Sequence, residues 1–176
     1  GYADRRSIGS AWSHPGKRGL LARLDMELTE RCNNDCIHCY INLPERDPAA
    51  IRAELSTGAV TEILREAASL GCLTVRYTGG EPLLREDFEA LYIAARNLGM
   101  RVLLFTNATR ITPRLAALFR RVPPLETVEI SLYGMTRATY ESVSRVPGSF
   151  EAAWRGIHLL LENGVPFTVK SALLPV

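Results

Sequence analysis

Cysteine is scarce in this chain, and long apolar runs are absent from it. The 176 residues include four cysteines, and aromatic residues make up 7% of the sequence. No apolar run approaches the ~20 residues that a membrane-spanning helix requires. The first 19 residues are rich in Gly, Ser and Arg and contain no apolar signal core. The sequence therefore does not indicate the disulfide framework of a small secreted domain.

An excess of charge of one sign is also lacking. There are 21 Lys and Arg residues against 19 Asp and Glu residues, which gives a net charge of +2. This balance gives no argument for a nucleic-acid partner or an anionic membrane, and we expect neither. A hydrophobic content of 47% is ordinary for a globular protein, and the length suits one domain with a core. We expect a loosely held N-terminal segment over residues 1–19 and one folded domain over residues 20–176.

Three of the four cysteines nevertheless gather within eight residues. Cys32, Cys36 and Cys39 follow the spacing Cys-x3-Cys-x2-Cys, which is typical of metal ligands in a short loop. Three alternatives compete: a structural zinc site with His38 as fourth ligand, a ferredoxin-like electron carrier, and a 4Fe–4S cluster with one iron left open. Zinc closure is awkward because His38 abuts Cys39, and ferredoxins use a different spacing with a further cysteine. These differences favour the open cluster.

Strand-like and helix-like segments alternate along the chain. Five strands separated by helices predict parallel β-α units. Strands buried on both faces would be continuously apolar, but here charged residues alternate with apolar ones. We therefore predict an α/β fold in which the sheet curls into a partial (β/α) barrel with outer helices and a wet lumen. The expected strands are 24–29, 73–78, 101–106, 127–132 and 167–172, and the expected helices are 57–70, 86–98, 112–121, 137–143 and 149–163.

The charged positions on the strands share one phase of the alternation. Unpaired buried charges cost several kcal/mol each, so pairing or water is required. We predict that Glu27, Arg76 and Glu129 point into the lumen and that Arg76 contacts a carboxylate. The full set comprises Asp25, Glu27, Arg76, Glu129 and Lys170.

Polar motifs follow the predicted strand ends. The cysteine loop follows the first strand, and the turn Gly79–Pro82 follows the second. Asn107 ends the third strand and Ser131 lies at the end of the fourth. Because β/α barrels build their active sites at the carboxyl ends of their strands, we predict that the cysteine loop and the glycine turn share one barrel mouth.

The cysteine motif together with the later Gly-Gly-Glu-Pro turn resembles the radical SAM superfamily, over roughly residues 22–176. The stretches 104–107 and 129–134 support this resemblance. More narrowly, the segment from Ser131 to Phe150 resembles members with a C-terminal SPASM domain, many of which modify ribosomally made peptides. The resemblance implies a 4Fe–4S cluster on Cys32, Cys36 and Cys39, whose fourth iron binds S-adenosylmethionine (SAM). Reductive cleavage of SAM would then give a 5′-deoxyadenosyl radical that abstracts a substrate hydrogen.

The same resemblance implies roles near the methionine and adenine parts of SAM. Gly79, Gly80 and Glu81 are expected against the methionine amino group, and Thr78 belongs to the same cofactor site. Backbone carbonyls and a carboxylate are suitable acceptors for an ammonium-like group. His38 stands where the family usually has an aromatic residue beside the adenine. Its alternative role is a hydrogen bond within the cluster loop.

Three further residues are implied around the ribose and the methionine carboxylate. Asn107 and Ser131 are expected to reach one of these groups, and Arg145 is expected to clamp the carboxylate. Their alternative roles are strand-end capping for Asn107 and Ser131 and a surface position for Arg145. The catalytic residue stays unassigned.

Members of the superfamily usually form a partial barrel of six β/α units, and this sequence supplies about five of them. The resemblance implies that the C-terminal part of the barrel and any auxiliary-cluster domain are missing, so the 176 residues alone are not expected to carry the full activity. The implied partners are a peptide or small-molecule substrate and an electron donor such as flavodoxin or ferredoxin, in the cytoplasm. The alternatives are a radical SAM enzyme of small-molecule or cofactor biosynthesis and a non-catalytic iron–sulfur module.

Overall fold

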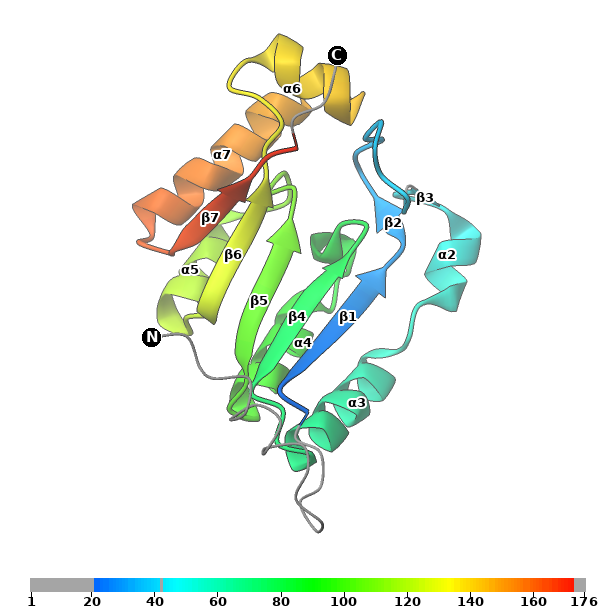
Figure 1. Ribbon diagram of the computed structural model, residues 1–176, viewed down its shortest axis with the longest axis vertical. Helices are drawn as coiled ribbons and strands as arrows, with labels where there is room; N and C mark the ends of the chain where they lie inside the picture. Colours follow the sequence, from blue (N-terminus) through cyan, green and yellow to red (C-terminus); the bar gives the residue numbers. More distant parts are fainter. Residues whose placement is uncertain (1–20, 42, 173–176) are drawn as a thin grey trace, which may run out of the picture.

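The computed structural model describes residues 21–41 and 43–172, and its centre is a five-stranded parallel sheet (Figure 1). The strand order is β1-β4-β5-β6-β7, and every neighbouring pair is parallel. This confirms the predicted α/β architecture of a partial barrel. The prediction for residues 1–19 lies outside the described residues. The strands are β1 (Arg23–Thr29), β4 (Thr74–Gly79), β5 (Arg101–Thr106), β6 (Leu125–Ser131) and β7 (Phe167–Lys170).

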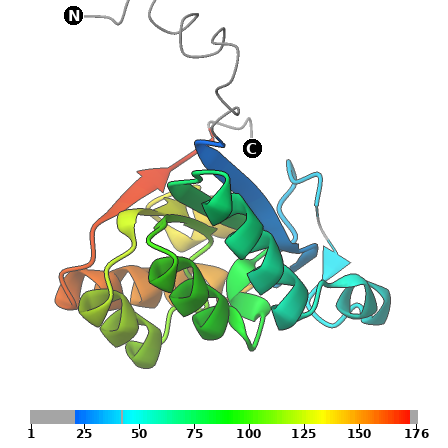
Figure 2. The ribbon, with the colours of Figure 1, turned by 90° about the horizontal axis from the view of Figure 1, so that it is seen from below.

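The helices that connect these strands gather on one side of the sheet. Figure 2 shows α3, α4, α5 and α7 together beneath the strands. Each predicted strand and helix is present, and each of its ends lies within two residues of the expected position. The helices are α3 (Thr57–Ser69), α4 (Phe88–Asn97), α5 (Pro113–Arg121), α6 (Arg137–Ser144) and α7 (Ser149–Glu162).

Within residues 21–41 and 43–172, four short elements were not predicted from the sequence, and all lie near the cysteine loop or the glycine turn. They are β2 (Arg31–Cys32), β3 (Leu43–Pro44), α2 (Pro48–Ala53) and the 3-10 turn η1 (Pro82–Leu84). Two-residue strands leave no periodic pattern to recognise. The start of α2 did carry a signal, because Asp47 caps the helix by accepting from the N–H groups of Ala49 and Ala50, and proline occupies the first turn.

The core lies between the sheet and the four helices. Every second residue of the central strands faces the helices and is buried, in agreement with the period of two in a strand. The polar end of the buried Tyr77 side chain is satisfied because its hydroxyl donates to the carbonyl oxygen of Leu91 (2.9 Å). Strand residues in this core include Val75, Tyr77, Val102, Leu104, Val128 and Ile130, each fully buried.

The opposite face of the sheet carries ion pairs between neighbouring strands. Arg76 contacts the Asp25 carboxylate, and Lys170 contacts the Glu129 carboxylate. Both cations also lie over the Phe105 ring, with the Arg76 guanidinium carbon 5.0 Å and the Lys170 Nζ 4.7 Å from its centroid. The predicted contact between Arg76 and a carboxylate is confirmed.

This charged face is open to solvent within the described part of the chain. The side chains of Arg76 and Asp25 keep 26% and 38% of their surface exposed. Glu27 is exposed as well and accepts a hydrogen bond from the Tyr40 hydroxyl (3.2 Å). The charges therefore meet water and one another. No helix in residues 21–41 and 43–172 has the length and apolar character needed to cross a membrane.

Candidate cofactor site

A pocket of about 150 Å³ lies at the carboxyl ends of the strands. It brings the cysteine loop and the glycine turn to the same mouth of the sheet, as the sequence predicted. Thr78, Asn107 and Ser131 join them there, whereas His38, Glu81 and Arg145 do not line the pocket. The lining residues are Cys32, Asn34, Cys36, Cys39, Thr78, Gly79, Gly80, Phe105, Thr106, Asn107, Ser131 and Tyr133.

All three loop cysteines are free thiols. Burial raises the pKa of Cys32 to about 12, with a smaller opposing contribution from the Asn34 N–H, which lies 3.4 Å from the Cys32 sulfur. Burial also raises the pKa of Cys36 to about 11, against a hydrogen bond from Tyr133. Thiols bind metals as thiolates, so occupation of this site must release protons and supply positive charge to offset the burial.

The donor set at the pocket fits an iron–sulfur cluster. Three thiols line one pocket, and sulfur ligands favour iron–sulfur clusters and zinc. In the part of the chain that the structure describes, no three His, Cys, Asp or Glu side chains converge closely enough to hold one ion. A cluster does not need such convergence, because each thiolate binds a different iron. The three thiols of this pocket are therefore suitable ligands for three irons of one cluster.

The glycine turn is packed against the chain that enters the cysteine loop. The N–H of Gly80 donates to the carbonyl of Thr29 (2.7 Å), and the N–H of Glu81 donates to the carbonyl of Arg31 (2.8 Å). A Cβ on Gly80 would lie 2.2 Å from the Arg31 oxygen, and one on Gly79 would lie 2.2 Å from the Thr29 oxygen. Gly79 also has a φ of +127°, which side chains disfavour. Both glycines are therefore required by close backbone approach.

Glu81 is fully buried, and its carboxylate is used inside the protein. One oxygen accepts from the Thr106 hydroxyl (2.8 Å) and the N–H of Leu83 (3.0 Å), and the other accepts from the N–H of Asn107 (2.8 Å). Burial raises the pKa of Glu81 to about 7, although these donors oppose the shift. The structure thus assigns the side chain to joining the turn after β4 to the end of β5. The expected contact between Glu81 and the SAM amino group stays a prediction.

Asn107 lines the pocket and also supports the cysteine loop. Its amide nitrogen donates to the Asn33 side chain (3.0 Å) and lies 3.9 Å from the Cys32 sulfur. Its oxygen accepts from the N–H of Thr109 (3.0 Å), which is the strand-end capping considered from the sequence. One residue therefore combines a capping role with a place at the candidate site.

His38 is exposed and packs edge-on against Tyr133, with ring centroids 4.9 Å apart. Tyr133 itself reaches the pocket, and so do Asn34 and Phe105, none of which had been predicted as site residues. Tyr133 lies two residues beyond Ser131, and Asn34 lies between two of the cysteines. Proximity to these motifs was the available signal.

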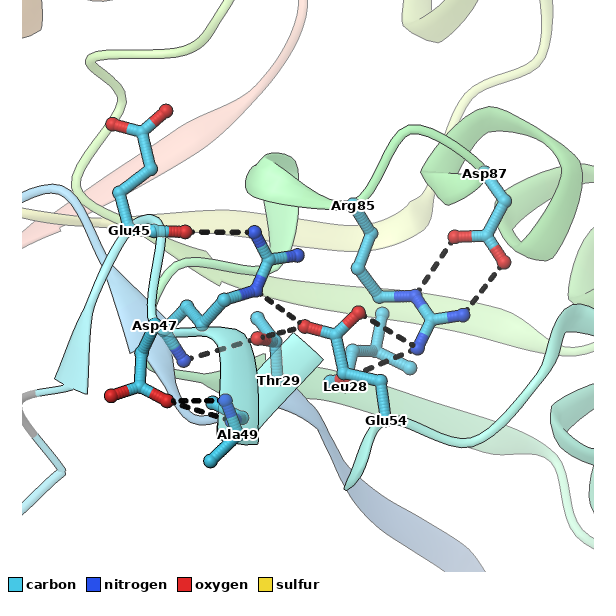
Figure 3. A network of polar contacts seen from close by, with 10 residues as sticks. Leu28, Thr29, Glu45, Asp47, Ala49, Glu54, Arg85 and Asp87 are labelled. Atoms are coloured by element: carbon cyan, nitrogen blue, oxygen red, sulfur yellow. Dashed lines mark hydrogen bonds and ion pairs between the residues drawn. The ribbon is translucent and has the colours of Figure 1, made fainter. Parts of the chain in front are cut away.

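A polar network holds the segment that leads into the cysteine loop. Figure 3 shows the Arg85 side chain between the carboxylates of Glu54 and Asp87. Glu54 also accepts from the Thr29 hydroxyl and from Arg31 Nε, both at 2.6 Å. Arg85 keeps 5% of its side chain exposed, and the two arginines balance the two acids. The network ties the segment after α2 to the end of β1 and to the turn after β4.

Residues 26–176 match the model of the Radical SAM superfamily. The chain belongs to this superfamily. Members of the superfamily use a 4Fe–4S cluster and SAM. The family match covers the cysteine loop, the glycine turn and all later strands.

Similar proteins include enzymes with different substrates. The chain is 36% identical to Fe-coproporphyrin III synthase of Methanosarcina barkeri over 138 residues, 78% of this chain and 33% of that protein. It is 33% identical to PqqA peptide cyclase of Gluconobacter oxydans over 145 residues, 82% of this chain and 39% of that protein. The chain thus spans between a third and two fifths of the length of these curated relatives.

The fold is also similar to that of solved structures. Native anSMEcpe with bound AdoMet and the Cp18Cys peptide aligns with a TM-score of 0.66 at 18% identity. The alignment covers 84% of this chain and 42% of that one. The likeness supports the assignment of the sheet and helices as part of a β/α barrel.

Proposed function

We propose that the intact protein is a radical SAM enzyme and that Cys32, Cys36 and Cys39 hold its 4Fe–4S cluster. The observation that carries the proposal is the pocket at the strand ends. Its walls combine the three free thiols with the glycine turn, Asn107 and Ser131. A cysteine loop at a site without these polar walls would suit a simple electron carrier instead.

When bound at this site, the cluster and SAM would supply reductive cleavage chemistry, driven by one electron from an external donor, for abstraction of a hydrogen atom from the substrate. The protein supplies positioning and shielding. The backbone of Gly79 and Gly80 is held against β1 and offers carbonyl acceptors for the SAM amino group. The Asn107 amide and the Ser131 hydroxyl offer polar contacts to the ribose or the carboxylate. Phe105 lines this pocket and also contacts the Arg76 and Lys170 cations of the charged face.

A ribosomally made peptide is the substrate class that we propose for the intact enzyme. The similarity to PqqA peptide cyclase supports it, and so does the shared fold with anSMEcpe, which was solved with a peptide. The mixed charges on the open face suit a peptide, because Arg76 and Lys170 already have carboxylate partners. A partly polar segment of either sign can be accommodated beside such pairs.

The similarity to Fe-coproporphyrin III synthase supports a second candidate, a porphyrin substrate. A carboxylate-rich porphyrin would require cations that are free to bind it. The two cations beside Phe105 are paired, and this observation favours the peptide. Incubation of the loaded full-length enzyme with Fe-coproporphyrin III tests the alternative, since porphyrin-dependent 5′-deoxyadenosine formation would overturn the peptide assignment.

We also propose a flavodoxin or ferredoxin as electron donor and a cytoplasmic location, where thiols stay reduced. The described cysteines are all free, in keeping with such a compartment. The near-neutral sequence supports no nucleic-acid partner.

Anaerobic reconstitution with iron and sulfide tests the central proposal. The wild-type chain should take up one 4Fe–4S cluster, and SAM should change its spectrum, which a non-catalytic module would not show. Cys36→Ala should lose the iron. Cys72→Ala is the matched control, because Cys72 is buried away from the pocket and donates to the Thr74 carbonyl (3.2 Å). Stoichiometric zinc without iron uptake would contradict the proposal.

A further inference from the structure

Asn34 is a polar side chain that is buried inside the cysteine loop. It lies between Cys32 and Cys36, keeps 4% of its surface exposed and lines the pocket at the strand ends. Among the residues that the structure describes, neither its amide nitrogen nor its amide oxygen has a hydrogen-bond partner. A buried amide without partners destabilises a fold, and an apolar side chain of the same shape would avoid that cost. Its place at the pocket indicates a ligand that supplies the missing partner.

The backbone around Asn34 is held by hydrogen bonds. Its own N–H donates to the Cys32 sulfur (3.4 Å). The next N–H, that of Asp35, donates to the carbonyl of Ser144 (2.9 Å) at the end of α6, where helix carbonyls lack partners within the helix. The amide therefore stays inside the protein as long as the loop keeps this conformation.

The Tyr140 hydroxyl is a second polar group at the same place, and it is fully buried and also lacks a partner among the described residues. Burial raises the pKa of Tyr140, the Asn34 amide opposes this shift, and charge on Cys36 or Cys32 raises it further. The hydroxyl and the amide thus lie side by side near two of the cysteine sulfurs. The amide has two N–H donors, and one hydroxyl can occupy at most one of them. At least one donor remains for a ligand.

The position of the Tyr140 hydroxyl is set by aromatic packing. Tyr140 lies on α6, and its ring centroid is 5.9 Å from that of Tyr133 and 5.8 Å from that of Phe150. A hydroxyl fixed in this way can donate to the Asn34 amide oxygen and leave both amide N–H groups free. The acceptors at hand are the cysteine sulfurs, which become stronger acceptors when they lose their protons to bind a metal.

We propose that the Asn34 amide, oriented by the Tyr140 hydroxyl, donates a hydrogen bond to a sulfur of the bound cluster or of the cysteines that hold it. The proposal rests on the proposed function, because it takes Cys32 and Cys36 as cluster ligands. Hydrogen bonds to the sulfurs help to set the potential of an iron–sulfur cluster. A donor stabilises the reduced cluster, which carries more negative charge, so Asn34 raises the midpoint potential.

The cluster-free full-length chain gives the first test. Asn34→Leu keeps the branched shape of the side chain and removes both unpaired polar atoms, so the melting temperature should be at or above that of wild type. Asn33→Leu is the matched control in the same loop, because the Asn33 amide donates to the Thr109 hydroxyl (2.7 Å), and it should melt at a lower temperature. A fall in Asn34→Leu as large as that in Asn33→Leu would show that the amide already has a structural partner, and would overturn the proposal.

The midpoint potential of the reconstituted full-length protein, measured without SAM, gives the second test. At the wild-type midpoint, the ratio of reduced to oxidised cluster should fall by about threefold or more in Asn34→Leu. Asn34→Ala removes the amide without added volume and should show the same fall. Asn163→Leu is the control, because Asn163 caps α7 at the far end of the sheet and donates to the Leu159 carbonyl (2.8 Å), so the ratio should not change. An unchanged potential in both Asn34 variants would overturn the proposal, whereas failure of the wild type to take up iron would count against the proposed function.

Tyr140→Phe tests the orientation of the amide. It should lower the midpoint potential of the wild type and have no further effect in the Asn34→Leu background. Pulsed EPR of the reduced cluster, with ¹⁵N in the asparagine side chains, should show a nitrogen coupling that Asn34→Leu removes. Equal shifts by Tyr140→Phe in the two backgrounds, or a coupling that persists in Asn34→Leu, would contradict the proposal. A potential shift in Asn34→Leu that appears only after SAM is added would assign the amide to SAM instead.

Discussion

The two faces of the sheet differ in what they contribute. The face toward the helices is apolar and closed, and its central residues are fully buried. The other face carries ion pairs that stay partly exposed. Burial of apolar surface dominates stability, whereas exposed ion pairs contribute about 0–1 kcal/mol. The comparison assigns stability to the covered face and leaves the open face available for the substrate that we propose.

The candidate cofactor site lies where these two faces meet. Glu81 and the glycine turn are buried like the core but are held by hydrogen bonds. Substitutions there should therefore affect both stability and cluster binding. Changes on the covered face should affect stability alone, and changes on the open face should leave stability nearly unaltered.

Leu104→Ala should have the largest effect on stability. Leu104 is fully buried between the sheet and the helices, so a cavity and lost apolar burial should lower the free energy of unfolding by about 2–5 kcal/mol. Leu161→Ala is the control, because Leu161 keeps 58% exposure on α7. Urea denaturation measures both. Equal losses in the two variants would show that the covered face is not the main source of stability.

Gly80→Ala should disrupt the packing of the glycine turn against the segment that enters the cysteine loop. The added Cβ would meet the Arg31 carbonyl, so the cysteine loop must move, with a loss of about 1–3 kcal/mol and reduced iron uptake after reconstitution. Gly58→Ala is the control, since its new Cβ has no neighbour nearer than 3.9 Å and alanine favours the helix. Iron uptake by Gly80→Ala equal to that of Gly58→Ala would remove the proposed coupling between turn and loop.

Glu81→Gln should lower stability by about 1–3 kcal/mol at pH 5, because the amide brings two N–H hydrogens toward the three donors around this side chain, where the protonated carboxyl brings one O–H. This loss should depend on pH. The pKa of Glu81 is raised from 4.5 to about 7, so the folded chain binds more protons than the unfolded chain between these values. Wild-type stability from this group therefore falls as pH rises through that window, by up to about 3 kcal/mol. Glutamine does not titrate, so the difference in unfolding free energy between wild type and variant should shrink from pH 5 to pH 7.5. A constant difference would contradict the assignment.

Arg76→Gln should have the smallest effect, about 0–1 kcal/mol, because its pair with Asp25 is partly exposed. A double-mutant cycle with Asp25→Asn should give a coupling energy in the same range. Substrate binding by the full-length enzyme should be more sensitive than stability. A coupling energy of several kcal/mol would show that the open face also holds the fold together.

The sequence predicted the sheet well because strand periodicity and Gly or Pro boundaries are local signals. It predicted one shared mouth because the carboxyl ends of parallel strands meet at one edge. The two-residue strands near the cysteine loop were not predicted, because so short a strand shows no periodic pattern of apolar residues. The α2 helix was not predicted either, even though Asp47 and Pro48 are signals of a helix start.

Side-chain partners were harder to predict than elements. Glu81 was assigned from the sequence to the cofactor site, and its hydrogen-bond donors Thr106 and Asn107 were not predicted because they lie on another strand end. Arg145 contacts Asp35 across 110 residues of sequence. The spacing of residues along a chain does not encode such distant contacts, since they depend on how strands and helices pack.

The pairing of β1 with β4 also bears on the order of folding and cluster insertion in this protein. Asp25 and Arg76 lie opposite each other and are 51 residues apart in sequence. Closing so long a loop costs chain entropy, and the glycine turn reaches the cysteine loop only after that closure. We therefore expect the cluster-free chain to unfold cooperatively in denaturant, with iron inserted into a mouth that is already built. In zinc fingers, by contrast, the metal supplies the folding energy.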